Sequence, residues 1–259
     1  MPDELQWLTM QYVDSGCRIV GSAGSQSGPW KLTKWGLQDK IIELNRGVTE
    51  LIKKILPPGC YVAGTILPTG KLLKPLGDLD REELGDAYRE EAVGYAEGGA
   101  DVIWVMTMMD IEEAVVAVKA AKDVSNLPVI ASMAFDYTPK GGRTMMGVDP
   151  KTAATRLVEA GADIVGHNCG GATPEEVTMI LKEMSEVVNN PLVSKPNAGK
   201  PEVTDRRTCW PVTPQQYAAE IPQWVAAGAR IVGGCCGSTP EHAARISEAL
   251  ETCAGNLHK

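Results

Sequence analysis

The fold of this chain is decided by the phrase Gly98-Gly99-Ala100-Asp101-Val102-Ile103-Trp104-Val105, in which two helix-stopping glycines are followed directly by an apolar strand. Near copies of its opening recur at Ala160-Gly161-Ala162-Asp163 and at Ala227-Gly228-Ala229-Arg230. The run from Val102 to Val105 has no polar side that could face water, which is typical of a strand buried on both faces of a parallel sheet. The recurrence predicts equivalent units, each ending one helix and starting one strand.

The same alternation continues along the whole chain. Short apolar runs predict seven strands, at residues 18–20, 61–63, 101–105, 128–132, 163–165, 192–194 and 230–232. Helical periodicity predicts eight helices, at residues 2–15, 37–55, 80–97, 110–121, 150–159, 174–188, 214–225 and 240–252. Strict alternation requires parallel strands with helical crossovers, in an open doubly wound sheet or a barrel. The repeated phrases favour an α/β fold of the (βα)8 TIM type, and no linker divides residues 1–259, so we predict a single domain.

The order of elements at the N-terminus does not fit a complete barrel. A helix at residues 2–15 precedes every predicted strand, so an eight-stranded barrel would lack its first strand. Three explanations are open: the barrel closes with seven strands, the sequence begins after the first strand, or a partner such as a second copy covers the gap. An uncovered edge of a parallel sheet would favour association.

Composition excludes several classes of protein. Hydrophobic residues make up 44% of the chain and charged residues 22%, which suits a globular protein with a sizeable core. The net charge of −8 argues against binding to nucleic acid or to anionic lipid. The longest uncharged apolar stretch, residues 102–109, is too short to span a bilayer. Seven cysteines without an apolar N-terminal signal region predict a reducing, cytoplasmic location.

Three of the cysteines follow strand ends on the same side of the predicted barrel. Cys169 lies just past the strand at 163–165, and Cys235 and Cys236 lie just past the strand at 230–232. The glycines around the pair allow the chain to turn, so that both thiols could face one ion. Each cysteine alone is most simply a small buried hydrophobe, but three thiols at neighbouring strand ends favour a metal site. Zinc suits a three-thiolate shell, and an open fourth position would take a substrate thiol and favour its thiolate form.

The motifs around these cysteines resemble those of a known family. Residues 166–169, Gly-His-Asn-Cys, and residues 233–242, Gly-Gly-Cys-Cys-Gly-Ser-Thr-Pro-Glu-His, are similar to the signature of the zinc-dependent homocysteine S-methyltransferases. That family includes betaine–homocysteine methyltransferase and the N-terminal module of cobalamin-dependent methionine synthase. The resemblance implies a (βα)8 barrel, Zn²⁺ held by Cys169, Cys235 and Cys236, and methyl transfer to a zinc-bound thiolate. Homocysteine is the leading acceptor, with methionine as the product.

The residues expected around the substrate depart from the family pattern. The family carries a glutamate, which pairs with the substrate amine, where this chain has Met106, and its first-strand Asp-Gly-Gly loop has no counterpart here. We expect His167, Asn168, Met106 and Asn197 to line the substrate pocket. His167 should point the same way as Cys169, two residues along a strand, although a buried core histidine is the alternative. Asn168 could equally hydrogen-bond the strand ends, and Asn197 could shape a loop.

Three functions are compatible with these features. The first is a cytoplasmic zinc-dependent methyltransferase acting on homocysteine, whose methyl donor comes from outside: a sulfonium or betaine molecule or a methyl-corrinoid protein. The second is a component of a corrinoid-dependent system that moves methyl groups between a small methylated compound and a separate corrinoid protein. The third is a non-catalytic relative that binds zinc or a partner protein. The expected partners include no nucleic acid and no membrane.

Overall fold

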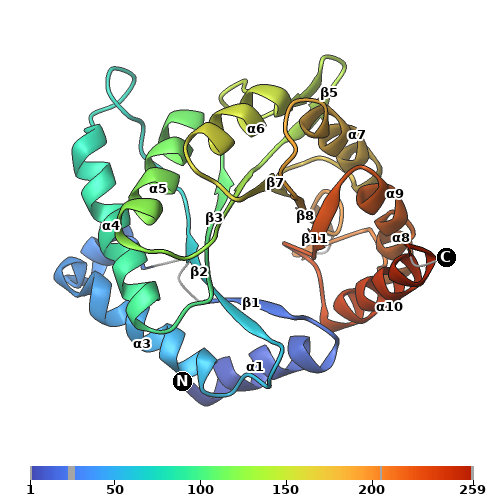
Figure 1. Cartoon of the computed structure of the whole chain (residues 1–259), viewed down its shortest axis with the longest axis horizontal. Helices are drawn as coiled ribbons and strands as arrows, with labels where there is room; N and C mark the ends of the chain where they lie inside the picture. Colours follow the sequence, from blue (N-terminus) through green and yellow to red (C-terminus); the bar gives the residue numbers. More distant parts are fainter. Residues whose placement is uncertain (1, 23–26, 205, 258–259) are drawn as a thin grey trace.

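Seven parallel strands form one strongly curved sheet around a common axis. The computed structural model describes residues 2–22, 27–204 and 206–257. Hydrogen bonds join each strand to the next in a single order. The strands in that order are β1 (Ile19–Gly21), β2 (Tyr61–Ile66), β3 (Val102–Met108), β4 (Val129–Met133), β7 (Ile164–Cys169), β8 (Leu192–Pro196) and β11 (Ala229–Val232). Figure 1 shows the sheet end-on, with the helices arranged outside it. The α/β barrel-type fold and all seven predicted strands are confirmed.

The helices follow the strands and cover the outer face of the sheet (Figure 1). They are α1 (Pro2–Asp14), α2 (Pro29–Leu32), α3 (Ile41–Lys53), α4 (Arg81–Glu97), α5 (Ile111–Val124), α6 (Pro150–Glu159), α7 (Pro174–Ser185), α8 (Pro214–Ala219), α9 (Ile221–Ala226) and α10 (Pro240–Leu257). Several segments depart from the prediction. The short helix α2 was not predicted, and residues 38–40 form a 3-10 turn before α3. The helix predicted at 214–225 divides at Glu220. Pro222 explains the division, because it lacks an N–H and its ring clashes with the preceding turn.

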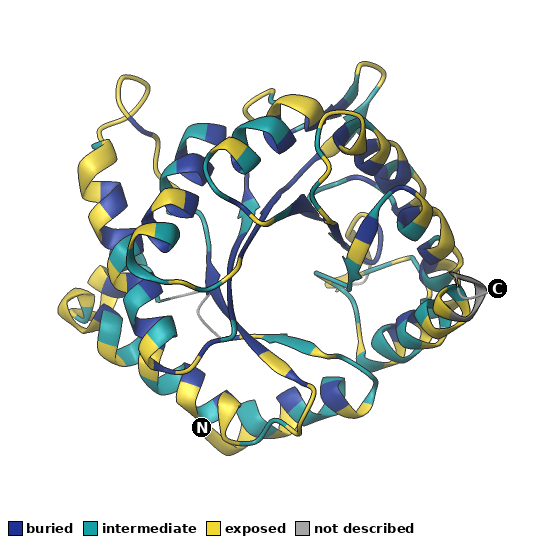
Figure 2. Ribbon diagram, in the orientation of Figure 1, coloured by how far each residue is buried: buried dark blue, intermediate teal, exposed yellow. Residues whose placement is uncertain are grey.

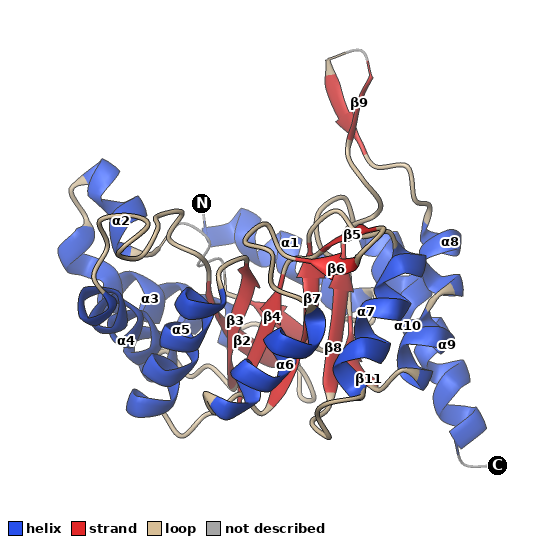
Figure 3. Ribbon diagram, turned by 90° about the horizontal axis from the view of Figure 1, so that it is seen from above, coloured by secondary structure: helices blue, strands red, loops and turns tan. Residues whose placement is uncertain are grey.

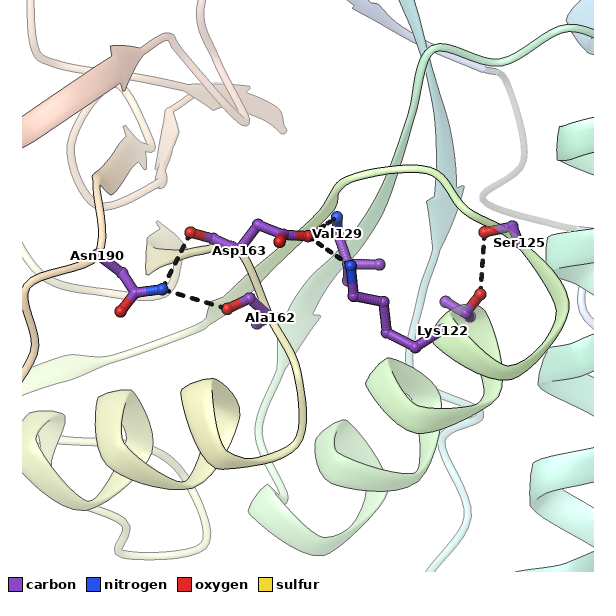
Figure 4. A network of polar contacts seen from close by, with 7 residues as sticks. Lys122, Ser125, Val129, Ala162, Asp163 and Asn190 are labelled. Atoms are coloured by element: carbon purple, nitrogen blue, oxygen red, sulfur yellow. Dashed lines mark hydrogen bonds and ion pairs between the residues drawn. The ribbon is translucent and has the colours of Figure 1, made fainter.

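The repeated helix-stop phrases have a structural role at the amino ends of the strands. Asp163 accepts hydrogen bonds from the Lys122 ammonium and from the backbone N–H of Val129, both at 2.7 Å (Figure 4). Asp101 makes the same pair of contacts with Lys53 and the N–H of Val62. Each aspartate therefore links its own strand to the preceding strand in the sheet and to the helix before that strand. This explains the aspartate in two of the three phrases; in the third, Arg230 instead donates to the carbonyls of Val225 and Ala229.

Buried apolar side chains lie on both faces of the sheet. Alternate strand residues such as Val62, Val105 and Val165 are fully buried, and most of the outer-face residues pack with the helices in the main core. The inner face carries a second cluster: Ala63, Val102, Trp104, Ile130 and Val193. Figure 2 shows buried residues concentrated on the strands and on the sheet-facing sides of the helices. Because paired residues of parallel strands share a face, this cluster identifies which residues of every strand point into the barrel.

The sheet does not close. Within the described residues β1 and β11 are the two ends of the strand order, and no backbone ladder joins them. Closure with seven strands, one of the three explanations above, is therefore wrong. A cavity of about 750 Å³ opens between these edges, and apolar side chains of α1 and α10, including Leu8 and Leu250, line it. α1 thus lies beside the position that an eighth strand would fill.

Two short antiparallel hairpins were not predicted. They are β5 (Asp136–Thr138) with β6 (Gly141–Arg143), and β9 (Glu202–Thr204) with β10 (Arg207–Cys209). Figure 3 shows the second hairpin projecting from the body of the fold. Between β1 and α2, residues 23–26 lie outside the described part of the chain. None of the described helices combines the length and the apolar character needed to cross a membrane.

Candidate metal centre

The chain turns sharply where β7 ends, and this turn presents the first cysteine. Cys169 has a φ of 60° and Gly170 a φ of 69°, both in the left-handed region. Gly170 is required there, because a Cβ at this position would lie 2.2 Å from the Phe135 carbonyl oxygen. The turn interrupts the strand alternation, so that Cys169 no longer points to the same side as His167.

The other two cysteines lie in the loop after β11, which runs beside the residues that follow β8. The Cys235 N–H donates to the Pro196 carbonyl at 2.9 Å, and the Cys236 carbonyl accepts from the Ala198 N–H at 2.9 Å. Gly237 ends this turn with a φ of 79°. A Cβ there would lie 2.2 Å from Cγ of Trp210, so both the backbone conformation and the space require glycine.

Asn197 joins the two cysteine loops. Its Nδ2 donates to the carbonyl oxygen of Gly170 at 2.7 Å, and its Oδ1 accepts from the N–H of Cys236 at 3.1 Å. The side chain is 5% exposed. The sequence left two roles open for Asn197, lining the pocket or shaping a loop. Its two hydrogen bonds hold the two cysteine loops together.

The three sulfur atoms converge at the carboxyl ends of β7 and β11. The Sγ atoms of Cys169, Cys235 and Cys236 all lie within 4.8 Å of one another, and those of Cys169 and Cys236 are 4.0 Å apart. Sulfur atoms about 2.3 Å from a tetrahedral ion would be about 3.8 Å apart. The donor set and its spacing therefore fit a zinc-type ion with only a small contraction. Two of the thiols are half-buried and Cys236 is exposed.

The close approach of the three thiols changes their pKa values in opposite directions. The Cys235 sulfur accepts hydrogen bonds from the other two thiols, and this lowers the pKa of Cys235 well below its usual range. The same interactions raise the pKa of Cys169 and of Cys236, and burial raises both further. The cluster therefore has one strongly favoured thiolate, at the most buried of its three sulfurs.

Asn168 connects this thiolate to the neighbouring strands. Its Oδ1 accepts from the Thr107 N–H at 2.6 Å and from the Ser132 hydroxyl at 2.7 Å, while its Nδ2 donates to Thr107 Oγ1 at 2.7 Å. Nδ2 also lies 3.9 Å from the Cys235 sulfur, within hydrogen-bonding range for sulfur. Thr107 has a φ of 61°, an unusual conformation for a β-branched residue. The hydrogen bonds with Asn168 hold it there.

Two other predicted pocket residues lie on opposite faces of the sheet. Met106 packs against the inner-face cluster. His167 is fully buried, lies 5.9 Å from the Phe135 ring, and has no hydrogen-bond partner for either ring nitrogen among the described residues. Burial lowers the pKa of His167 to about 4. Since His167 alternates with the inward-facing Asn168, it points away from the barrel interior, and the structure does not bring it to the cavity.

One residue of the cavity was missed. Lys195 lines the cavity together with Cys235 and Trp104, and it pairs in register with Asn168 on the inner face. The signal available in the sequence was its alternation with the apolar Val193. That signal is weak without knowledge of the strand register.

A sequence profile identifies the family to which these features belong. The profile of the homocysteine S-methyltransferases matches residues 1–250, nearly the whole chain. The chain belongs to the homocysteine S-methyltransferase family. The family predicted from the cysteine motifs is therefore confirmed.

Curated relatives and solved structures agree with this family. The chain is 27% identical over 264 residues to a methionine synthase of Mycobacterium leprae, and 28% identical over 261 residues to one of Mycobacterium tuberculosis. These alignments cover 97% and 96% of this chain but only 22% of each relative. The metallated homocysteine methyltransferase MmuM of Escherichia coli has a similar fold, with a TM-score of 0.78 at 22% identity, over 95% of this chain and 84% of that one.

Proposed function

We propose that this protein is a zinc-dependent methyltransferase that transfers a methyl group to a thiol, with homocysteine as the leading acceptor. The observation that carries the proposal is the convergence of three cysteine sulfurs within 4.8 Å in a chain of this family. Cys169, Cys235 and Cys236 would hold the ion. Bound there, Zn²⁺ would lower the pKa of a substrate thiol and favour the thiolate that accepts the methyl group.

The protein's own residues would position the reacting groups. Asn197 fixes the two cysteine loops relative to each other, and Asn168 donates a hydrogen bond toward Cys235. The cavity of about 750 Å³ reaches Cys235 and has room for a small thiol. The methyl donor would come from outside: a sulfonium compound, a betaine or a methyl-corrinoid protein. We further propose that residues 1–259 act as one domain in the cytoplasm.

Metal content provides the direct test. Wild-type protein should contain about one zinc per chain, and Cys235→Ser should lose most of it, because a catalytic zinc has about three protein ligands. Cys209→Ser is the matched control: Cys209 is an exposed thiol in the β9–β10 hairpin, outside the cluster. Wild type without zinc, or equal zinc in the Cys235 variant, would contradict the proposal.

Activity is measured separately with homocysteine and three donors: S-methylmethionine, glycine betaine and methylcobalamin. Methionine formation by the zinc-loaded protein, lost in Cys235→Ser and kept in Cys209→Ser, is the expected outcome. Zinc binding without methyl transfer from any donor would instead favour the non-catalytic alternative.

A second candidate keeps the metal centre and changes the partner. The protein would be one component of a corrinoid-dependent system, moving methyl groups between a small methylated compound and a separate corrinoid protein. The observation that favours it is Met106, an apolar side chain on the inner face where a carboxylate could pair with an amino-acid substrate. Turnover of free methylcobalamin at micromolar homocysteine would exclude this candidate.

A further inference from the structure

The inner face of the barrel is almost entirely uncharged. The strand registers place Thr65 with Trp104, Trp104 with Ile130, and Asn168 with Lys195 on the same face. Following these registers around the described strands, every register-paired inward-facing residue is apolar or neutral except Lys195. Arg18 and Arg230 also line the cavity, but Arg230 lies at a register irregularity of β11 and donates to the carbonyls of Val225 and Ala229. Lys195 is therefore the one charged residue among the paired inward-facing positions of the described strands.

The Lys195 side chain extends into the cavity. Its aliphatic part passes Gly233 of the neighbouring chain segment, where a Cβ would lie 3.6 Å from Lys195 Cγ. The side chain is half-buried and lines the same cavity as Cys235. Within the described part of the chain, its ammonium forms no ion pair and no hydrogen bond. Its charge acts on the nearby Cys235 thiolate, which places the cation close to the cysteine cluster. With no hydrogen bond or ion pair of its own among the described residues, the ammonium is available to bind a ligand anion.

The same cavity offers nothing comparable to a ligand cation. Among the described residues, Glu251 is the only carboxylate that lines it. That residue is exposed and lies about three turns along α10 from Pro240, whereas the cysteines lie just before that helix. At the end of β3 the inner face carries Met106. The cysteine thiolates, where the sulfur of the ligand must bind, are the other source of negative charge in this cavity. A buried ammonium held away from them, at the opposite end of the ligand, would therefore be left without a counter-charge, which is strongly unfavourable.

We propose that Lys195 determines the substrate class: the cavity binds a thiol that carries a carboxylate or another acidic group, and it does not recognise an α-ammonium group. This inference rests on the proposed function, because it concerns the thiol presented to the cysteine cluster. Lys195 pairs with the acidic end of the substrate, and the thiol end reaches the metal centre near Cys235.

Three thiols of similar length separate the two ends of homocysteine. 4-Mercaptobutanoate is homocysteine without its amino group, and 3-aminopropane-1-thiol is homocysteine without its carboxylate. Binding of each thiol is followed by the absorption of the Co²⁺-substituted protein, which changes when another thiolate becomes a ligand. The readout is an equilibrium affinity and does not depend on turnover or on the methyl donor.

We expect wild type to bind 4-mercaptobutanoate at least as tightly as homocysteine and about 10-fold more tightly than the amine. Lys195→Gln should weaken binding of the acid by about 10- to 100-fold, the range for a hydrogen bond to a charged group, and should leave the amine within about 2-fold. Lys195→Arg keeps the charge and should keep the preference. Lys182→Gln, at an exposed position on α7, is the matched control and should change nothing.

Two outcomes would overturn the inference. In the first, homocysteine binds more than about 5-fold more tightly than 4-mercaptobutanoate. A difference of that size is what a hydrogen bond to a charged group contributes, so the cavity would then recognise the ammonium group. Alternatively, Lys195→Gln could weaken cobalt binding and change all three thiols equally. Lys195 would then balance the charge of the thiolates and not that of the substrate.

Failure of Co²⁺ to bind would contradict the proposed function and not the charge preference of the cavity. In that case calorimetry on the metal-free protein decides the inference, with butanoate and propylammonium as the probes. Binding of butanoate that is lost in Lys195→Gln supports the inference, and absent or equal binding of the two ions overturns it.

Discussion

Asn197 provides the sharpest test of how the metal centre is built. Its amide group forms two hydrogen bonds, one to the carbonyl of Gly170 and one from the N–H of Cys236, and it thereby joins the two loops that carry the cysteines. Asn197→Ala removes both bonds. A buried donor or acceptor left without a partner costs about 1–3 kcal/mol, so the two together amount to about 2–6 kcal/mol. Cys236 is exposed, so water can replace part of the lost hydrogen bond to its N–H. We therefore expect the loss of unfolding free energy to lie near the lower end of this range.

The effect on metal affinity has a different origin. The sulfurs of Cys169 and Cys236 belong to separate loops, and their 4.0 Å separation depends on the contact between those loops. Without Asn197, the metal-free protein would sample wider separations, and zinc binding would have to restrict them. Loss of a residue that orients metal ligands typically weakens metal affinity by about 10- to 100-fold. We expect a loss in this range for Asn197→Ala.

The assay is a competition between the protein and a chromogenic zinc chelator, combined with urea unfolding of the metal-free protein. Asn190→Ala is the matched control, because Asn190 also joins two backbone segments, through the carbonyls of Ala162 and Asp163 (Figure 4). Those contacts lie at the opposite ends of the strands from the cysteines. The control should lower stability and leave zinc affinity unchanged. Zinc affinity in Asn197→Ala within about 2-fold of wild type, below the range for such orienting residues, would refute this account.

Three further substitutions test the fold around the site. Asp163→Ala removes an acceptor for two hydrogen bonds at the start of β7 and should lower the unfolding free energy by about 1–2 kcal/mol in urea titrations, since the carboxylate is partly exposed. Gly237→Ala should destabilise more than Gly36→Ala, because both have a positive φ but only Gly237 has a neighbouring ring in the way; equal losses would contradict the steric argument. Burial raises the pKa of Glu91 from 4.5 to about 8, so the folded state retains a proton that the unfolded state releases. The contribution of Glu91 to stability should therefore fall as pH rises between these values, whereas that of His167, whose pKa is lowered to about 4, rises up to its unfolded value of 6.5. Because both proteins share His167, the test compares unfolding of wild type and Glu91→Gln at about pH 5 and about pH 8. Wild type should lose more stability than the variant between the two, and an equal change in both would exclude a neutral buried carboxyl.

The starts of the strands could be predicted from sequence more closely than their ends. The run beginning at Asp101 has apolar residues that only a buried strand explains, and β3 begins there as predicted. The strand continues to Met108, however, three residues beyond the apolar run. β7 likewise continues through His167 and Asn168 to Cys169. The carboxyl ends of these strands carry the residues of the candidate site. Most of their side chains are polar or thiol groups, so these positions lack the apolar pattern by which a strand is recognised in the sequence.

The cysteine cluster could be predicted because its signal is local. Two thiols in a glycine-rich turn and a third at a strand end give enough information when the strands are parallel and only one strand, β8, lies between them. The orientation of His167 could not be predicted, because the left-handed turn at Cys169 removes the alternation on which the prediction depended. The hydrogen bonds of Asn197 and the position of Lys195 depend on the register between strands distant in sequence. No local pattern carries that information.

The metal centre and the substrate cavity depend on different parts of the structure. The cysteine loops are held by backbone hydrogen bonds and by Asn197, and these contacts do not involve the inward-facing side chains of the sheet. Met106 and Lys195 therefore take no part in the hydrogen bonds that hold the cysteine loops, although the charge of Lys195 acts on the Cys235 thiolate. Asn168 is the exception, because it contacts Thr107 next to Met106, pairs in register with Lys195, and donates toward the Cys235 sulfur. A change at the end of β3 would therefore reach the Cys235 thiolate through Asn168.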